Sequence, residues 1–210
     1  MTRAAAIKHG YTTGARTLAS RSVSGLTRTR VTPNALTTSG VLLCAAASVL
    51  VLFEGRNELL FYWLAAAVFV AGSLLDILDG ALARAGGKTT PFGAFLDSTT
   101  DRVSEGFMLT AIAYVLATHH HPVFVAVAMA AVAGSFLVSY TRAKAEAIGL
   151  RGDVGIGSRA ERVVVIAAGL VLAPWGMLTW SLVILAGTAW LTVGQRVLHV
   201  RKQLLEANSE

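Results

Sequence analysis

The sequence has little charge, almost no cysteine and no apolar segment at its start. Charged side chains make up 14% of its 210 residues, whereas a soluble domain carries about 25%. The single cysteine, Cys44, excludes an intramolecular disulfide, and its neighbours in LLCAAA include no base that would activate it as a nucleophile. The first 30 residues are basic rather than apolar, so we expect no signal peptide.

The sequence instead contains long apolar runs. Hydrophobic residues make up 54% of the chain, and the mean hydropathy is +0.61. The uncharged runs 35–53 and 122–141 each have the roughly 20 residues that cross a bilayer core. The run 163–195 is too long for one crossing, and APWG at 173–176 predicts a turn within it. The sequence therefore predicts an all-α, polytopic membrane protein with six transmembrane helices, over residues 35–53, 59–84, 92–117, 122–147, 158–173 and 177–199.

Two polar segments are expected to flank this membrane domain, which we place at 31–200. Residues 1–30 form a basic juxtamembrane segment, and residues 201–210 form a polar C-terminal tail. In the first segment Leu18, Val23 and Leu26 are spaced among arginines, which predicts an amphipathic helix on an anionic membrane surface. A disordered basic tail is the alternative interpretation.

The basic residues indicate how the spans are oriented. All but one of the 18 lysines and arginines fall on one side of the predicted spans, and the exception is Arg56. Because such residues favour the cytoplasmic side, we expect a cell-membrane protein with both termini in the cytoplasm. The net charge of +6 would then attract anionic membrane lipids. Nucleic acid is not an expected partner, because the bases flank spans instead of forming a separate domain.

Four aspartates stand out in the apolar sequence GSLLDILDGALARAGGKTTPFGAFLDSTTDR, residues 72–102. Asp76 and Asp79 are three residues apart, and Asp97 and Asp101 are four apart, so each pair shares one helical face. The connection at 85–91 is short, so we expect antiparallel neighbouring helices whose acidic faces converge on the cytoplasmic side.

Four converging carboxylates need a compensating positive charge. One acid at mid-membrane already costs on the order of 3 kcal/mol, and carboxylates brought together also repel one another. Hard divalent ions such as Mg²⁺ prefer oxygen ligands, and two of them suit a displacement at phosphorus. The alternative is that these are solvated acids at helix ends, paired with local arginines.

The spacing of these residues resembles a family signature. Asp76-x-x-Asp79-Gly80-x-x-Ala83-Arg84, eight residues, then Gly93-x-x-x-Asp97-x-x-x-Asp101 is similar to the motif of CDP-alcohol phosphatidyltransferases. The resemblance extends over about 30–200, because TPNALTTSG at 32–40 is also similar to the family's entry into its first span. It implies a homodimer with two divalent ions, Mg²⁺ or Mn²⁺, in a cavity open to the cytoplasm. It also implies that an alcohol attacks the β-phosphorus of a CDP-linked lipid and releases CMP.

The resemblance assigns roles to residues by their position in the motif. The implied metal ligands are Asp76, Asp79, Asp97 and Asp101, and Asp101 is also the implied general base. The implied CDP-lipid site consists of Asn34, Thr37, Gly80, Ala83, Arg84 and Gly93. The chemistry agrees independently, because the pKa of an alcohol lies far above neutrality and its attack needs a base within hydrogen-bond reach.

A basic segment later in the chain bears on the acceptor alcohol. SYTRAKAEAIGLRGDVGIGSRAER, residues 139–162, resembles the corresponding segment of actinobacterial phosphatidylinositol phosphate synthases. The resemblance implies that the acceptor phosphate is bound by Arg142, Arg162 and Arg196. Arginine suits this role because it offers a fork of donors to phosphate oxygens. Position 142 departs from the family pattern, in which lysine stands there. We assign Lys144, Arg151 and Arg159 to the cavity rim or to lipid headgroups.

The predicted function is transfer of the phosphatidyl group from CDP-diacylglycerol to inositol 1-phosphate. Glycerol 3-phosphate is the alternative acceptor, because arginines would also bind its phosphate. A small ion or metal transporter is the alternative class of protein, although a transporter would hold its acids near mid-membrane on broken helices. The triplet His119–His121 lies on the opposite side, where a polar turn is expected and metal capture is the alternative.

Overall fold

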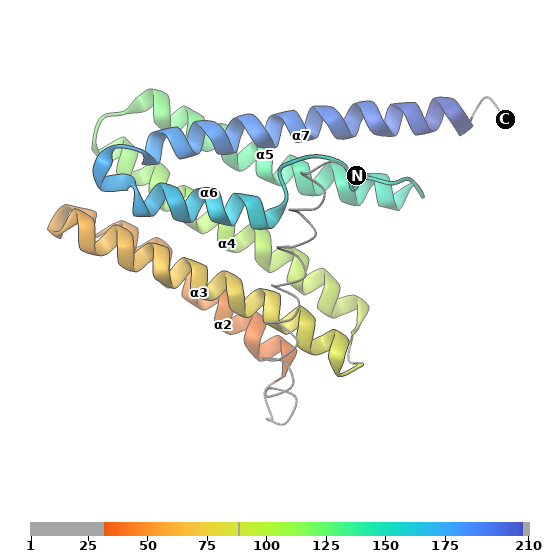
Figure 1. Cartoon of the computed structure of the whole chain (residues 1–210), viewed down its shortest axis with the longest axis horizontal. Coiled ribbons are helices and arrows are strands. Elements are labelled where there is room, and N and C mark those ends of the chain that lie inside the picture. Colours follow the sequence, from red (N-terminus) through yellow and green to blue (C-terminus); the bar gives the residue numbers. More distant parts are fainter. Residues whose placement is uncertain (1–31, 88, 208–210) are drawn as a thin grey trace, which may run out of the picture.

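The computed structural model describes residues 32–87 and 89–207 and is helical throughout this part, without a β-strand (Figure 1). The predicted interfacial helix within 1–30 lies outside the described residues. The long helices of the described part are α2 Pro33–Val51, α3 Glu58–Ala85, α4 Pro91–Thr118, α5 Pro122–Ala147, α6 Arg159–Val171 and α7 Leu178–Ala207. Two short 3₁₀ turns, Glu54–Arg56 and Ala173–Trp175, join α2 to α3 and α6 to α7.

Local sequence explains where the helices begin and end. Thr32 and Thr90 each precede a proline, and their hydroxyls accept bonds from the first turns of α2 and α4. Gly176 adopts φ of 75°, which permits the tight turn predicted at 173–176. Every predicted helix boundary lies within two residues of the observed one except the last, because α7 continues from the predicted end at 199 to Ala207. Residues 201–207 of the predicted polar tail are therefore helical.

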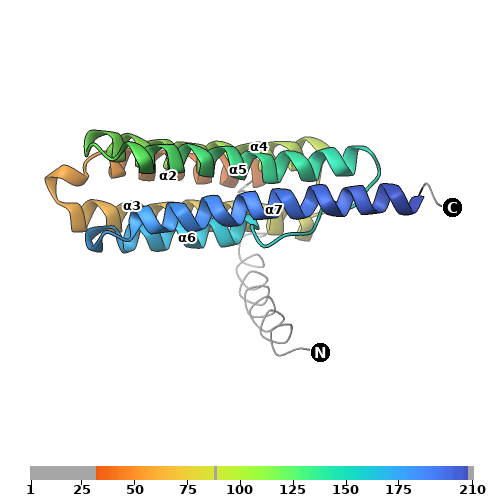
Figure 2. The same cartoon turned by 90° about the horizontal axis from the view of Figure 1, so that it is seen from above.

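The helices form two layers, with α2, α4 and α5 in one and α3, α6 and α7 in the other (Figure 2). Their principal contacts close a ring in the order α2, α3, α6, α7, α5 and α4. The expectation that α3 and α4 pack as antiparallel neighbours is wrong in this respect, because α2 packs against both of them. The apolar core includes Phe69, Met108, Ile112, Leu170 and Leu182.

Four of the helices, α2, α3, α5 and α7, are long and apolar enough to cross a membrane. α4 has 28 residues but carries the charged residues Asp97, Asp101, Arg102 and Glu105, and α6 has only 13 residues. The outer surface of the bundle exposes large apolar side chains such as Trp63, Val164 and Trp180, at 48%, 65% and 60% exposure. Such an exterior fits the lipid environment of a membrane protein.

The histidine triplet forms the turn between α4 and α5, as predicted. His120 adopts φ of 58° there. His119 Nε2 lies 2.8 Å from Glu54 Oε1, which connects this turn to the one between α2 and α3.

Two glycines bring α2 and α3 into close contact. A Cβ atom added to Gly72 would lie 2.8 Å from the carbonyl oxygen of Gly40 and 2.8 Å from Cys44 Sγ. A Cβ atom added to Gly40 would lie 2.9 Å from the carbonyl oxygen of Gly72. Small residues of this kind allow helix backbones to approach closely in membranes. This contact sets the position of α2 relative to the acidic end of α3.

Substituting Gly72 with alanine is therefore expected to lower the thermal stability of the protein. Overpacking of this kind costs about 1–3 kcal/mol, because the added methyl group would collide with backbone. The matched control is Gly187→Ala in α7, where a Cβ atom would meet nothing within 4 Å and where alanine gains about 1 kcal/mol of helix propensity. Thermal unfolding of both variants in detergent measures the difference, and equal midpoints would contradict a tight α2–α3 contact.

Candidate active site

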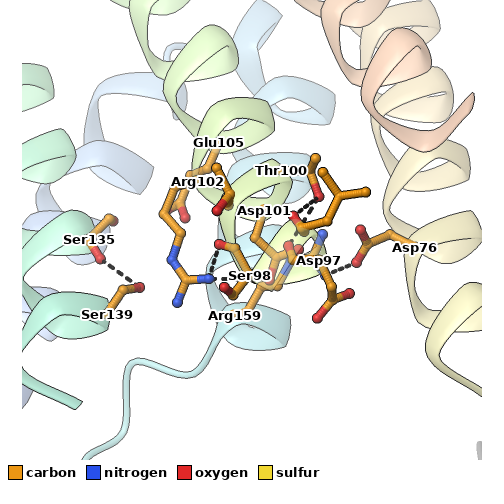
Figure 3. A network of polar contacts seen from close by, with 12 residues as sticks. Asp76, Asp97, Ser98, Thr100, Asp101, Arg102, Glu105, Ser135, Ser139 and Arg159 are labelled. Carbon is orange, nitrogen blue, oxygen red and sulfur yellow. Dashed lines mark hydrogen bonds and ion pairs between the residues drawn. The ribbon is translucent and has the colours of Figure 1, made fainter. Parts of the chain in front are cut away.

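Three of the four predicted aspartates come together between α3 and α4. Asp76, Asp97 and Asp101 each offer a carboxylate oxygen, and these three oxygens lie within 4.8 Å of one another. Figure 3 shows Asp76 on α3 facing Asp97 and Asp101 on α4. Asp76 is buried, and the other two are half-buried. The prediction that the two acidic helix faces converge is therefore confirmed for these three residues.

Asp79, the fourth aspartate, is buried at the side of this group and binds a neighbouring helix. Its Oδ2 accepts a hydrogen bond from the hydroxyl of Thr37 on α2. Thr37 thus lies beside an acid of the motif because α2 packs closely on α3. Asp79 Oδ1 is buried and has no hydrogen-bond partner within the described part of the chain.

These oxygens fit a divalent cation. Buried polar atoms are normally hydrogen-bonded, yet Asp79 Oδ1 has no hydrogen-bond partner within the described residues. The donors are all carboxylates, which are the ligands that Mg²⁺ and Mn²⁺ prefer. A bound cation would satisfy these oxygens and offset the repulsion between the acids.

Arg159, at the start of α6, lies at the centre of the acidic cluster. Its Nη1 atom donates to Asp76 Oδ2 and lies 2.6 Å from Asp101 Oδ1. The sequence analysis placed Arg159 at the rim or among lipid headgroups, and the structure corrects this assignment. Because the guanidinium contacts two of the clustered carboxylates, a metal ion that uses the same oxygens would have to displace it.

The residues implied for the CDP-lipid site gather at the same end of the bundle, where α2 and α4 begin and α3 ends (Figure 1). Asn34 is exposed in the first turn of α2, and Arg84 is exposed in the last turn of α3. A Cβ atom added to Gly80 would lie 3.3 Å from Arg84 Nη1, so the glycine leaves space for that guanidinium. Ala83 and Gly93 are half-buried nearby, on α3 and α4. These positions share this end of the bundle with the aspartates, and their binding of a CDP-lipid stays a prediction.

A cavity of about 1010 Å³ connects the acidic cluster with the basic segment. Asp97 and Asp101 line one part of it. The three predicted acceptor residues, Arg142, Arg162 and Arg196, line the same cavity. Arg102 and Arg159 also line it, whereas from the sequence Arg102 was assigned no role there and Arg159 was placed at the rim or among lipid headgroups. The cavity therefore combines carboxylates with an excess of guanidinium groups.

The three predicted arginines differ in what they bind. Arg142 is exposed and pairs with Glu146 at 2.9 Å on its own helix. Arg162 is buried and forms a two-fold contact with Glu105. Arg196 is buried and donates to the backbone carbonyls of Val138, within α5, and Val154, in the α5–α6 connection. Their binding of an acceptor phosphate stays a prediction.

The connection between α5 and α6, residues 148–158, is held by one face of α7. Thr192, Arg196 and Gln203 are spaced four and seven residues apart, so they share this face. They bind backbone groups of residues 151–157 at distances of 2.8–3.1 Å. The extension of α7 beyond its predicted end brings Gln203 to this connection, which forms one wall of the cavity.

A second cavity, of about 1020 Å³, lies between α3 and α6 and has an apolar lining. Trp63, Val70 and Ile77 contribute to it from α3, and Val164 contributes from α6. Arg159 lines both cavities, so the apolar groove begins where the acidic cluster ends. A molecule with a charged head and apolar tails matches this arrangement.

A helical bundle with paired aspartates beside a basic cavity defines a membrane transferase acting on a phosphorylated substrate. Residues 30–200 match the family described as CDP-alcohol phosphatidyltransferase, and the chain belongs to that family. It is therefore a transferase of phospholipid synthesis, and the resemblance noted in the sequence is confirmed.

Two relatives are named as synthases of lipids that carry inositol phosphate. The archaetidylinositol phosphate synthase of Pyrococcus horikoshii is 36% identical over 175 residues, which cover 83% of this chain and 86% of that protein. The phosphatidylinositol phosphate synthase of Mycobacterium marinum is 34% identical over 188 residues, covering 84% and 76%.

Crystal structures of the phosphatidylinositol phosphate synthase of Mycobacterium tuberculosis share the fold. The structure with CDP-DAG bound has a TM-score of 0.76 and 30% identity, and the match covers 87% of this chain and 92% of that one. The complex with manganese and citrate has a TM-score of 0.77 and 32% identity, with 87% and 88% covered. A divalent metal in this neighbour agrees with the fit of the aspartate cluster.

Proposed function

We propose that the protein transfers the phosphatidyl group of CDP-diacylglycerol to inositol 1-phosphate and releases CMP. The observation that carries this proposal is that one cavity holds Asp97 and Asp101 together with three arginines suited to a phosphate. The names of the archaetidylinositol and phosphatidylinositol phosphate synthases among its relatives support the choice of acceptor. The neighbour with bound CDP-DAG supports the choice of donor.

The proposed metal site consists of the four aspartates of the motif. Asp76, Asp79, Asp97 and Asp101 would hold two Mg²⁺ or Mn²⁺ ions, with Asp79 completing the site from the side. Bound ions of this kind neutralise a diphosphate and make CMP a better leaving group. The hydroxyl of Thr37 would orient Asp79 by donating to its second oxygen.

Asp101 is the proposed general base. It lines the cavity beside the arginines, so a hydroxyl of an acceptor bound there can come within hydrogen-bond reach. The acceptor oxygen would form a bond to the β-phosphorus while the bond from this phosphorus to the bridging oxygen breaks. The electron pair leaves with CMP, and Asp101 takes the hydroxyl proton. No covalent enzyme intermediate is needed.

The CDP-lipid would bind across the two cavities. Its nucleotide would lie at the end of the bundle where α2 and α4 begin and α3 ends. The residues proposed to bind it are Asn34, Thr37, Gly80, Ala83, Arg84 and Gly93. Its acyl chains would occupy the apolar groove between α3 and α6. Because Arg159 lines both cavities, it would lie where the diphosphate joins the lipid part of the substrate.

We further infer that all six long helices of the described part cross the membrane and that two chains form a homodimer. α4 is long enough at 28 residues, and its polar residues face the cluster and the cavity. The positions of the basic residues support cytoplasmic termini and an active site open to the cytoplasm. Residues 1–30 would lie on the membrane surface as an amphipathic helix.

A comparison of four acceptors tests the proposed reaction. Purified protein is incubated with CDP-diacylglycerol and Mg²⁺, and CMP release is measured with inositol 1-phosphate, glycerol 3-phosphate, free inositol or serine. We expect kcat/KM for inositol 1-phosphate to exceed that of free inositol and of serine at least about 10-fold, because a site built for a phosphate leaves its donors unpaired without one, and to exceed that of glycerol 3-phosphate as well. Faster turnover with glycerol 3-phosphate would instead assign the alternative acceptor.

A further inference from the structure

Glu105 and Arg162 form a buried ion pair beside the cavity that Asp101 and Arg162 line. Arg162 Nε lies 2.8 Å from Glu105 Oε1, and Arg162 Nη2 lies 2.9 Å from Glu105 Oε2. The two residues are 8% and 5% exposed, and 57 positions separate them along the chain. Burying two charges is expensive, and such pairs rarely add stability over apolar residues. Stability alone therefore does not explain why this ion pair is buried, which indicates a role in function.

The pair lies one helical turn from the acidic cluster on both of its helices. Glu105 follows Asp101 by four residues in α4, and Arg162 follows Arg159 by three residues in α6. The two helices thus present two successive contacts, Arg159 with Asp101 and Arg162 with Glu105. The first is shared with Asp76 of α3, whereas the second joins only α4 and α6.

The hydrogen bonds of Arg162 leave part of its guanidinium available. The group has five N–H donors. Nε and one N–H of Nη2 are directed to Glu105, and one N–H of Nη1 donates to the carbonyl oxygen of Gly157 at 2.8 Å. One N–H on each terminal nitrogen remains, and Arg162 lines the cavity that also contains Asp101. N–H groups on the two terminal nitrogens of a guanidinium can bind phosphate oxygens.

We propose that Glu105 is a positioning residue for the acceptor, because it fixes Arg162 so that the two remaining donors hold the acceptor's phosphate. The inference rests on the proposed function. Glu105 and the proposed base Asp101 belong to the same helix, one turn apart, so α4 sets the distance between the phosphate anchor and the base. An acceptor then reacts well only if its phosphate and its attacking hydroxyl match this distance. Pre-set geometry of this kind is a large contribution to catalysis.

The test is the variant Glu105→Gln, assayed with inositol 1-phosphate. The amide replaces one carboxylate oxygen with an N–H group, which cannot accept a hydrogen bond from the guanidinium, and it removes the negative charge. Arg162 is then no longer held in place. We expect the KM for inositol 1-phosphate to rise about 10-fold or more, while the KM for CDP-diacylglycerol changes less than about 2-fold. The matched control is Glu54→Gln, which removes the charge of a half-buried carboxylate that contacts His119 at the opposite end of the bundle, far from the cavity. This control should leave both KM values unchanged.

A double variant separates positioning from folding. If Glu105→Gln alone is too unstable, Glu105→Gln with Arg162→Met removes both charges and avoids an unpaired buried ion. We expect this protein to fold and to show the raised acceptor KM. An unchanged acceptor KM in either folded variant, or an equal rise in both KM values, would overturn the role of Glu105.

The wild-type assay distinguishes a failure of the proposed function from a failure of this inference. If wild-type protein prefers glycerol 3-phosphate, the proposed acceptor is wrong, and the Glu105 variants are then measured with that acceptor with the same expectation. If the preferred acceptor has no phosphate, the positioning role of Glu105 is overturned as well. If inositol 1-phosphate is preferred and the variants behave like wild type, only the positioning role fails.

Discussion

Asp101→Asn is expected to reduce CMP release by at least about 10²-fold, the contribution of a general base in many enzymes. Asparagine keeps the shape of the side chain but cannot take the hydroxyl proton. It also removes one of the three carboxylates whose oxygens lie within 4.8 Å of one another. Binding of CDP-diacylglycerol should be partly retained, because the other aspartates remain. Steady-state CMP release and a separate lipid-binding assay measure the two effects.

The matched control for this variant is Glu58→Gln, which changes a carboxylate in the first turn of α3, at the opposite end from Asp76. It should retain wild-type turnover. The variant Asp101→Glu keeps a carboxylate and shifts it by one methylene, so it should retain more activity than Asp101→Asn. Unchanged activity in Asp101→Asn would remove the assignment of Asp101 as the base.

Chelation of divalent ions with EDTA is expected to abolish turnover, and added Mg²⁺ or Mn²⁺ should restore it. The clustered carboxylates need a compensating charge, and the diphosphate of the substrate adds more negative charge to the same site. Asp79→Asn should raise the Mn²⁺ concentration needed for half-maximal activity, because Asp79 Oδ1 is one of the buried oxygens without a hydrogen bond in the described structure. Full activity in EDTA would contradict the metal site.

A titration with Mn²⁺ also tests whether Arg159 competes with a cation for the aspartates. Its guanidinium contacts Asp76 and Asp101 and so competes with a cation for their oxygens. Arg159→Ala should tighten Mn²⁺ binding at least about 10-fold in the absence of substrate, since about 1.4 kcal/mol suffices for this change and a unit charge about 4 Å away can contribute up to about 4 kcal/mol. Electron paramagnetic resonance of free Mn²⁺ measures this without turnover. Arg159→Lys, which keeps the charge, should bind Mn²⁺ like wild type, and equal affinity in the alanine variant would contradict the competition.

The aspartate motif shows how far local sequence can predict a site. Spacings of three and four residues placed each pair of acids on one helical face, and three of the four side chains do converge. The expected direct packing of α3 on α4 was wrong, because α2 contacts both helices. The prediction about the acids succeeded anyway, because a short connection fixes where the two helices meet even when their other ends diverge (Figure 1).

Arg159 and Glu105 show what the sequence left undetected. From the sequence, Arg159 was assigned to the cavity rim or to lipid headgroups, and Glu105 was assigned no role. Their partners lie 83 and 57 positions away along the chain. Helical periodicity relates residues within one or two turns, so it contains no information about such pairs. Eighteen basic and 12 acidic residues allow many pairings, and composition favours none of them.

By itself the sequence determined the helices, their ends and the faces that carry the acids, because helix capping, apolar length and helical spacing act over a few residues. The tertiary structure alone decided which charges meet. α6 packs against both α3 and α7, so its first turn brings Arg159 to the aspartates and Arg162 to Glu105. Which charged side chains meet depends on how apolar helix faces and small residues such as Gly40 and Gly72 fit together. Many sequences share the same apolar pattern, so only the packing of the folded helices fixes the partners.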